Sequence, residues 1–120
     1  MEKYDLGLIQ SNIEQMLLRA CSEHEQAIIA FGEAHDVYAD DFVVYRRAKG
    51  DVTGRLKQEG EKVGVIKALA EGETVDLKGK MLKSEGQMKK CRMMVDALAE
   101  RINAIKFIGK RLEVAEVNAR

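Results

Sequence analysis

Two long stretches of the chain carry apolar or small residues at alternating spacings of three and four. The first series includes Ile13, Leu17, Phe31 and Tyr38, and it is interrupted only at Asp41. This heptad pattern predicts an amphipathic helix whose apolar seam packs against another helix. Alanine occupies positions 20, 27, 34 and 48 of the series, where it allows a partner helix to approach closely. We therefore predict a long helix from about residue 5 to about residue 49.

The second series is interrupted at Ser84 and Gly109 and is otherwise apolar. It predicts a helix from about residue 75 to about residue 117, with Thr74 as its N-cap and Asp76 in its first turn, where negative charge is favourable. Two helices of similar length favour an antiparallel hairpin, in which the numbers of facing residues add up to about 123. The members of this second seam are Leu77, Met81, Met88, Cys91, Val95, Leu98, Ile102, Ile105 and Leu112.

Five glycines lie between residues 50 and 72 and separate the two seams. Because glycine weakens helices, we predict a glycine-rich join in this range instead of one continuous helix. Residues 62–70 can still form a short connecting helix with Val63, Ile66 and Leu69 on one side. This helix is expected to cap the end of the hairpin or to swap onto a neighbouring subunit. Residues 1–120 are thus predicted to form a single all-α domain.

Apolar residues also flank both seams. A hairpin seam buries about two residues in seven, at roughly 1.5–3 kcal/mol for each aliphatic side chain. Ordering seven residues of backbone costs on the order of 7–14 kcal/mol, so the flanks must be covered as well. We therefore predict a homo-oligomer, either a four-helix dimer or a larger ring. The flanking residues are Ile9, Met16, Ile28 and Phe42 on the first helix and Met94, Ile108 and Ala115 on the second.

Charge is unevenly distributed along the chain, although the formal net charge is zero. Residues 1–45 hold two basic side chains against nine acidic ones, whereas residues 46–120 hold eighteen against eleven. A dense basic stretch predicts a phosphate-binding surface for nucleic acid, with affinity that falls steeply with salt. Because aromatic residues are few, binding would be directed at the nucleic-acid backbone. The stretch contains Lys78, Lys80, Lys83, Lys89, Lys90 and Arg92.

The antiparallel register offers another interpretation of the same lysines. It places the acidic stretch from Glu33 to Asp41 opposite Lys83 to Lys90, so that the opposite charges would cancel between the helices. Both interpretations stay open at this point, and they are compatible if an oligomer repeats a row of lysines that are not neutralised.

Patterns for catalysis and metal binding are incomplete. Cys21 and His24 share a helical face and Cys91 can approach from the other helix, but nothing supplies the fourth ligand of a zinc site. Met81 follows Gly79-Lys80 where a phosphate-binding loop has serine or threonine. The carboxylates between Glu33 and Asp41 are expected to form a solvated face. We expect no enzyme activity, cofactor, metal or small-molecule substrate.

Membrane insertion and export are not expected either. No run approaches the roughly 18 apolar residues of a membrane span, and the first residues lack the basic start and apolar stretch of a signal peptide. Two cysteines seventy positions apart do not make a disulfide framework. A cytoplasmic location is therefore expected.

The stretch from Glu59-Gly60-Glu61-Lys62-Val63 to Ala68-Leu69-Ala70-Glu71-Gly72 precedes a lysine-rich helix that ends in Leu98-Ala99-Glu100-Arg101-Ile102-Asn103-Ala104-Ile105-Lys106. This layout resembles small helical proteins of tailed phages and prophages, and over residues 25–115 it resembles the UvsY-type recombination mediators. The resemblance implies an oligomer in the cytoplasm of a bacterial host that binds single-stranded DNA. Such an oligomer helps to load a recombinase onto strands coated by a single-strand-binding protein. A phage-type adaptor or inhibitor that binds a host protein through its charged faces is the alternative.

Overall fold

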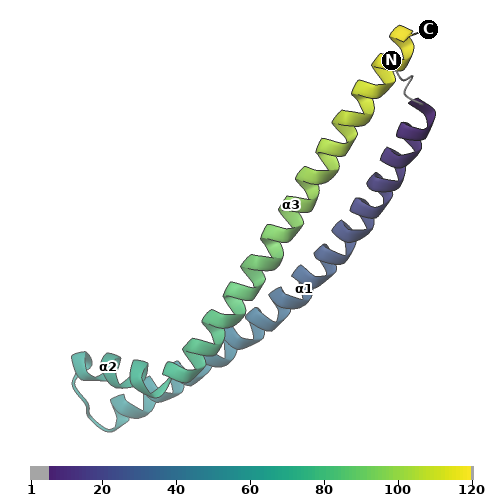
Figure 1. The fold of residues 1–120 in the computed structure, drawn as a ribbon. Coiled ribbons are helices and arrows are strands. Elements are labelled where there is room, and N and C mark those ends of the chain that lie inside the picture. The colour runs from purple at the N-terminus through teal and green to yellow at the C-terminus, as the bar shows by residue number, and fades with distance from the viewer. Residues whose placement is uncertain (1–5, 120) are drawn as a thin grey trace. The chain divides into compact units, whose positions relative to one another are not determined.

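The computed structural model describes residues 6–119 and consists, over that range, of three helices without a strand (Figure 1). Helix α1 spans Leu6–Gln58, α2 spans Val63–Glu73 and α3 spans Val75–Ala119. The predicted all-α class with two long helices and a short one between them is therefore confirmed. None of these helices is both long and apolar enough to cross a membrane.

The chain divides into two compact units, and both long helices contribute to each of them. Unit 1 comprises the described residues up to Ala30 together with those from Cys91 onward, and unit 2 comprises Phe31–Lys90. Unit 1 therefore pairs the first part of α1 with the last part of α3. Unit 2 contains the remainder of both helices and the whole of α2.

The residues of both predicted seams lie toward the inside of these units. In unit 1, Ala20, Leu98 and Ile105 are buried, and in unit 2, Tyr45 and Met81 are buried. The other seam residues are half-buried, and they are Ile13, Leu17, Ala27, Cys91, Val95, Ile102 and Leu112 in unit 1 and Phe31, Ala34, Tyr38, Ala48, Leu77 and Met88 in unit 2. Packing of α1 against α3 through the heptad positions accounts for this burial.

Contacts between the long helices give the antiparallel register. In unit 1, an Arg101 Nη1 atom lies 3.7 Å from Glu23 Oε2. In unit 2, Lys80 Nζ lies 3.6 Å from Asp41 Oδ1. The predicted register places Glu23 opposite residue 100 and Asp41 opposite residue 82, so each observed partner lies within two residues of its predicted position.

Helix α1 continues to Gln58 and does not end near Lys49, which corrects the predicted boundary. Gly50 and Gly54 lie within the helix, where a glycine costs roughly 1 kcal/mol relative to alanine but does not break hydrogen bonding. The buried side chain of Leu56 favours the extra turns. The described join between α1 and α2 is therefore only residues 59–62.

A single glycine ends α1. Gly60 has φ of 79°, in the left-handed region that side chains with a Cβ rarely adopt. The amide of Gly60 donates to the carbonyl of Lys57 at 3.1 Å, and the amide of Glu61 donates to the carbonyl of Leu56 at 3.2 Å. This pair of hydrogen bonds is the Schellman motif, which satisfies the last carbonyls of a helix.

Replacing Gly60 by alanine is expected to destabilise the protein by about 1–2 kcal/mol, because alanine is strained at a positive φ. Gly54→Ala is the matched control, since a Cβ at position 54 meets nothing within 4 Å. That variant is expected to gain up to about 1 kcal/mol from helix propensity. Urea denaturation measures both changes, and equal effects of the two variants would contradict the assignment of Gly60 as the helix terminator.

Helix α2 packs through a different face from the one predicted. Ile66 is 5% exposed and Ala70 is 1% exposed, whereas Val63 is 84% exposed and Leu69 faces solvent. The prediction is therefore right for Ile66 and wrong for Val63 and Leu69. The buried residues Ile66, Ala70 and Thr74 follow one another at a spacing of four. They therefore lie on one side of the helix, and this side faces inward.

Thr74 stands at the N-cap position of α3, since its carbonyl accepts a hydrogen bond from the amide of Lys78 at 2.9 Å, but its side chain does not supply the predicted cap, which is a second correction. Its hydroxyl donates to the carbonyl of Ala70 at 2.6 Å, and its own amide donates to the same carbonyl at 3.2 Å. A threonine side chain bonds readily to the carbonyl four residues earlier, and this bond competes with N-capping. Asp76 does lie in the first turn of α3, as predicted.

The predicted apolar flanks stay uncovered within a single chain. Ile9 is half-buried, but the other six flanking residues are exposed: Met16, Ile28, Phe42, Met94, Ile108 and Ala115. The chain's own helices therefore cover the seams and leave the flanks to solvent or to another molecule.

Candidate nucleic-acid interface

The six basic residues of the stretch on α3 are all exposed. Lys78, Lys80, Lys83, Lys89 and Lys90 belong to unit 2, whereas Arg92 belongs to unit 1. The interface described below is therefore built from the five lysines of unit 2. Because successive residues turn by about 100° around a helix, these lysines do not all point to one side.

Three of the five lysines line one open groove between α1 and α3. Lys80, Lys83 and Lys90 surround a space of about 560 Å³. The rest of its wall is formed by Ala34, Val37 and Asp41 from α1 and by Ser84, Gly86 and Gln87 from α3. The groove thus combines an apolar wall with flexible cationic side chains, an arrangement that suits a ligand with an anionic backbone.

Asp41 lies at the inner side of this groove and is the residue that interrupts the first heptad seam. Its side chain is 12% exposed, and it forms the ion pair with Lys80. The hydroxyl of Ser84, the interruption in the other seam, donates a hydrogen bond to the Asp41 carboxylate. Asp41 and Ser84 therefore contact each other between the two helices. The serine hydroxyl supplies a hydrogen bond that a half-buried carboxylate needs. A polar layer of this kind fixes the register of two packed helices.

Lys89 has its partner on its own helix. Its Nζ lies 2.8 Å from Glu85 Oε1, one turn earlier. This hydrogen bond and the negative charge of Glu85 raise the pKa of Lys89, so the ammonium group stays charged well above neutral pH. Lys89 is consequently less available to a phosphate than a lysine without a carboxylate beside it.

The expected cancellation of charge between the helices is partial. Over the side chains that the structure describes, Asp41 is the only acid of the stretch from Glu33 to Asp41 with an ion pair to a lysine of α3. Within the same part of the chain, Lys78, Lys83 and Lys90 have no ion pair. Positive charge therefore remains on this segment, with Lys83 and Lys90 at the groove.

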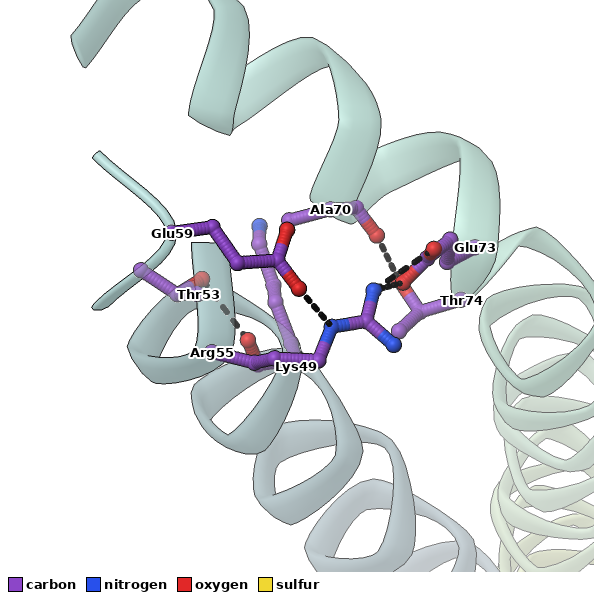
Figure 2. A network of polar contacts seen from close by, with 7 residues as sticks. All are labelled: Lys49, Thr53, Arg55, Glu59, Ala70, Glu73 and Thr74. Carbon is purple, nitrogen blue, oxygen red and sulfur yellow. Dashed lines mark hydrogen bonds and ion pairs between the residues drawn. The ribbon is translucent and has the colours of Figure 1, made fainter. Parts of the chain in front are cut away.

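A polar network at the α1–α2 junction was not anticipated from the sequence (Figure 2). The Nη2 atom of Arg55 lies 2.7 and 2.6 Å from the two carboxylate oxygens of Glu73, and its Nε lies 3.8 Å from Glu59. The charge and hydrogen bonds of Glu73 raise the pKa of Arg55 further above its already high value. This network holds the end of α1 beside the end of α2. It is a structural link, in which one guanidinium joins a carboxylate of α2 and one of the join between the helices.

The sulfur and imidazole groups do not assemble a metal site in the described part of the chain. Cys21, His24 and Cys91 all belong to unit 1, and both cysteines are half-buried and form no disulfide. Among the described residues, no group of three or more histidine, cysteine, aspartate or glutamate side chains is arranged to hold a metal ion.

No protein-family model, curated protein or solved structure matches the chain.

Proposed function

We propose that this chain is a non-enzymatic, homo-oligomeric accessory protein that binds single-stranded DNA in phage recombination or replication. The DNA backbone would lie along the groove of unit 2 and contact Lys83 and Lys90, with Lys78 adding charge elsewhere on the same helix segment. Loading of a recombinase, which the resemblance to the UvsY-type mediators implies, is part of the proposal.

One observation carries this proposal, namely the positive charge that the fold leaves unneutralised beside an apolar groove wall. Lys83 and Lys90 line the groove together with Val37 and Ala34. Phosphates attract such lysines and release counterions on binding. The groove contains few aromatic residues on which bases could stack, so binding is expected to be sequence-tolerant.

The experiment compares two double charge reversals by fluorescence anisotropy with a labelled single-stranded oligonucleotide. Lys83→Glu with Lys90→Glu removes two groove cations and adds two anions, and we expect binding to weaken at least about 100-fold at low salt. Lys62→Glu with Lys67→Glu makes the same change in net charge on exposed residues at α2. The control variant is expected to weaken binding less than about tenfold, through the long-range field alone.

Equal losses in the two variants would mean that net charge and not the groove governs binding, and would contradict the proposed interface. Circular dichroism checks that both variants remain helical. Since neither Lys83 nor Lys90 has an ion pair within the described chain, unfolding of the groove variant would itself contradict the assignment.

A protein-binding adaptor is the second candidate, and the exposed residues Val37 and Val44, two turns apart on one face of α1, favour it. Exposed apolar side chains that share a face are typical of protein interaction sites. If the wild-type protein does not bind oligonucleotides even at low salt, this candidate replaces the first one.

A further inference from the structure

Helix α3 carries a second heptad series on its exposed side within unit 1. The series runs through Met93, Ala97, Glu100, Ala104, Phe107, Arg111 and Val114, at alternating spacings of four and three. Every one of these residues is exposed, with Phe107 at 60%. The buried seam of α3 uses other positions, so this outer series has no partner within the described chain. Heptad spacing of this kind is the pattern of a helix that packs against another helix.

The outer series has small residues at Ala97 and Ala104 and larger ones from Phe107 onward, and it is hollowed toward its C-terminal end. Phe107, Lys110, Arg111 and Val114 line an open depression of about 330 Å³. The guanidinium of Arg111 lies 5.2 Å from the centre of the Phe107 ring, which keeps both side chains at this surface. A helix that presents small residues can pack closely against this depression. Ala97 and Ala104 of the outer series are such residues.

The two charged members of the series determine which orientation is favourable. In a parallel pair of α3 helices, Glu100 would face Glu100 and Arg111 would face Arg111, so like charges would meet. In an antiparallel pair related by a twofold axis, Glu100 of each copy faces Arg111 of the other. In the same antiparallel alignment, Ala104 faces Phe107 of the other copy and Ala97 faces Val114, so that small residues face large ones. The surface is therefore complementary to a second copy of itself in one orientation.

We infer that two copies of this chain associate through the outer face of α3 in unit 1, antiparallel and about a twofold axis between Ala104 and Phe107. This inference rests on the self-association in the proposed function and names its surface and symmetry. The aromatic ring of Phe107 is the central apolar anchor, and the two Glu100–Arg111 pairs set the direction of the helices.

A charge-swap series tests the pairing by analytical ultracentrifugation of the full chain. Glu100→Arg and Arg111→Glu each place like charges opposite one another, and each is expected to weaken the dimer about tenfold. The double variant with both substitutions restores opposite charges across the twofold axis, so its dissociation constant is expected to return to near the wild-type value. The two residues lie eleven positions, or about 16 Å, apart on one helix, so pairing within a chain cannot produce this rescue.

Phe107→Glu tests the anchor and is expected to weaken the dimer about 30-fold or more. Val63→Glu is the matched control, because Val63 is also exposed but lies on α2 in unit 2, and it should leave the dimer unchanged. A wild-type protein that stays monomeric at micromolar concentration, or a double variant as weak as the single ones, would overturn the inference. Oligonucleotide binding is measured on the same samples. A monomeric Phe107→Glu variant that still binds DNA separates the dimer from the nucleic-acid proposal.

Discussion

Replacing Leu98 by alanine is expected to lower the free energy of unfolding by about 2–5 kcal/mol. Leu98 is 8% exposed and lies in the seam through which α3 packs in unit 1. Truncation removes apolar contacts and leaves a cavity between two helices that have few other apolar residues to fill it. Because a protein of this size is stabilised by only about 5–15 kcal/mol, such a loss is a large part of the total.

Leu18→Ala is the control for this prediction, since it makes the same chemical change in the same unit. Leu18 is 72% exposed, and its truncation should alter stability by less than about 0.5 kcal/mol. Urea denaturation monitored by circular dichroism measures both variants. Similar losses for Leu18 and Leu98 would mean that the seam does not face the inside of unit 1.

Replacing Ile66 by alanine is expected to cost about 2–4 kcal/mol and to release α2 from unit 2. Helix α2 has only 11 residues, a length at which an isolated helix is marginal in water. Ile66 and Ala70 are its buried residues, so Ile66 provides most of the apolar contact that holds it. Hydrogen exchange should therefore accelerate at the amides of α2 before the rest of the chain is affected.

Leu69→Ala is the matched control on the same helix. Leu69 is among the exposed apolar residues, and its truncation should leave exchange in α2 nearly unchanged. If Leu69→Ala accelerates exchange in α2 as much as Ile66→Ala does, then Leu69 also faces inward, as the spacing of Val63, Ile66 and Leu69 indicated.

The architecture could be predicted because the heptad series of both long helices are almost complete. Two of the three interruptions were also informative, since the side chains of Asp41 and Ser84 form a hydrogen bond with each other. The register followed from the similar lengths of the helices, and the contact between Arg101 and Glu23 lies close to the predicted alignment. Long periodic patterns define such packing because every turn repeats the same preference.

The join could not be predicted to the same degree, because its glycines look alike in the sequence. Gly50 and Gly54 continue a helix while Gly60 ends one, and the difference is the positive φ that only Gly60 adopts. The buried face of α2 was also misjudged. Six of the eleven residues of α2 are apolar and lie on several sides of the helix, so the sequence does not single out the face that packs against the long helices.

The candidate interface was predictable in composition but not in geometry. The density of lysines is visible in the sequence. Which of them form ion pairs depends on the angular position of each side chain around the helix: Lys80 pairs with Asp41, whereas Lys83 has no ion pair in the described chain. The link between Arg55 and Glu73 was missed because it depends on where α2 turns back along α1.

The salt dependence of binding to a short single-stranded oligonucleotide tests the central claim most directly. If Lys78, Lys83 and Lys90 each neutralise one phosphate, the logarithm of the association constant should fall with the logarithm of salt concentration with a slope of about −2. A slope near zero, or no binding at low salt, would contradict the proposed nucleic-acid interface.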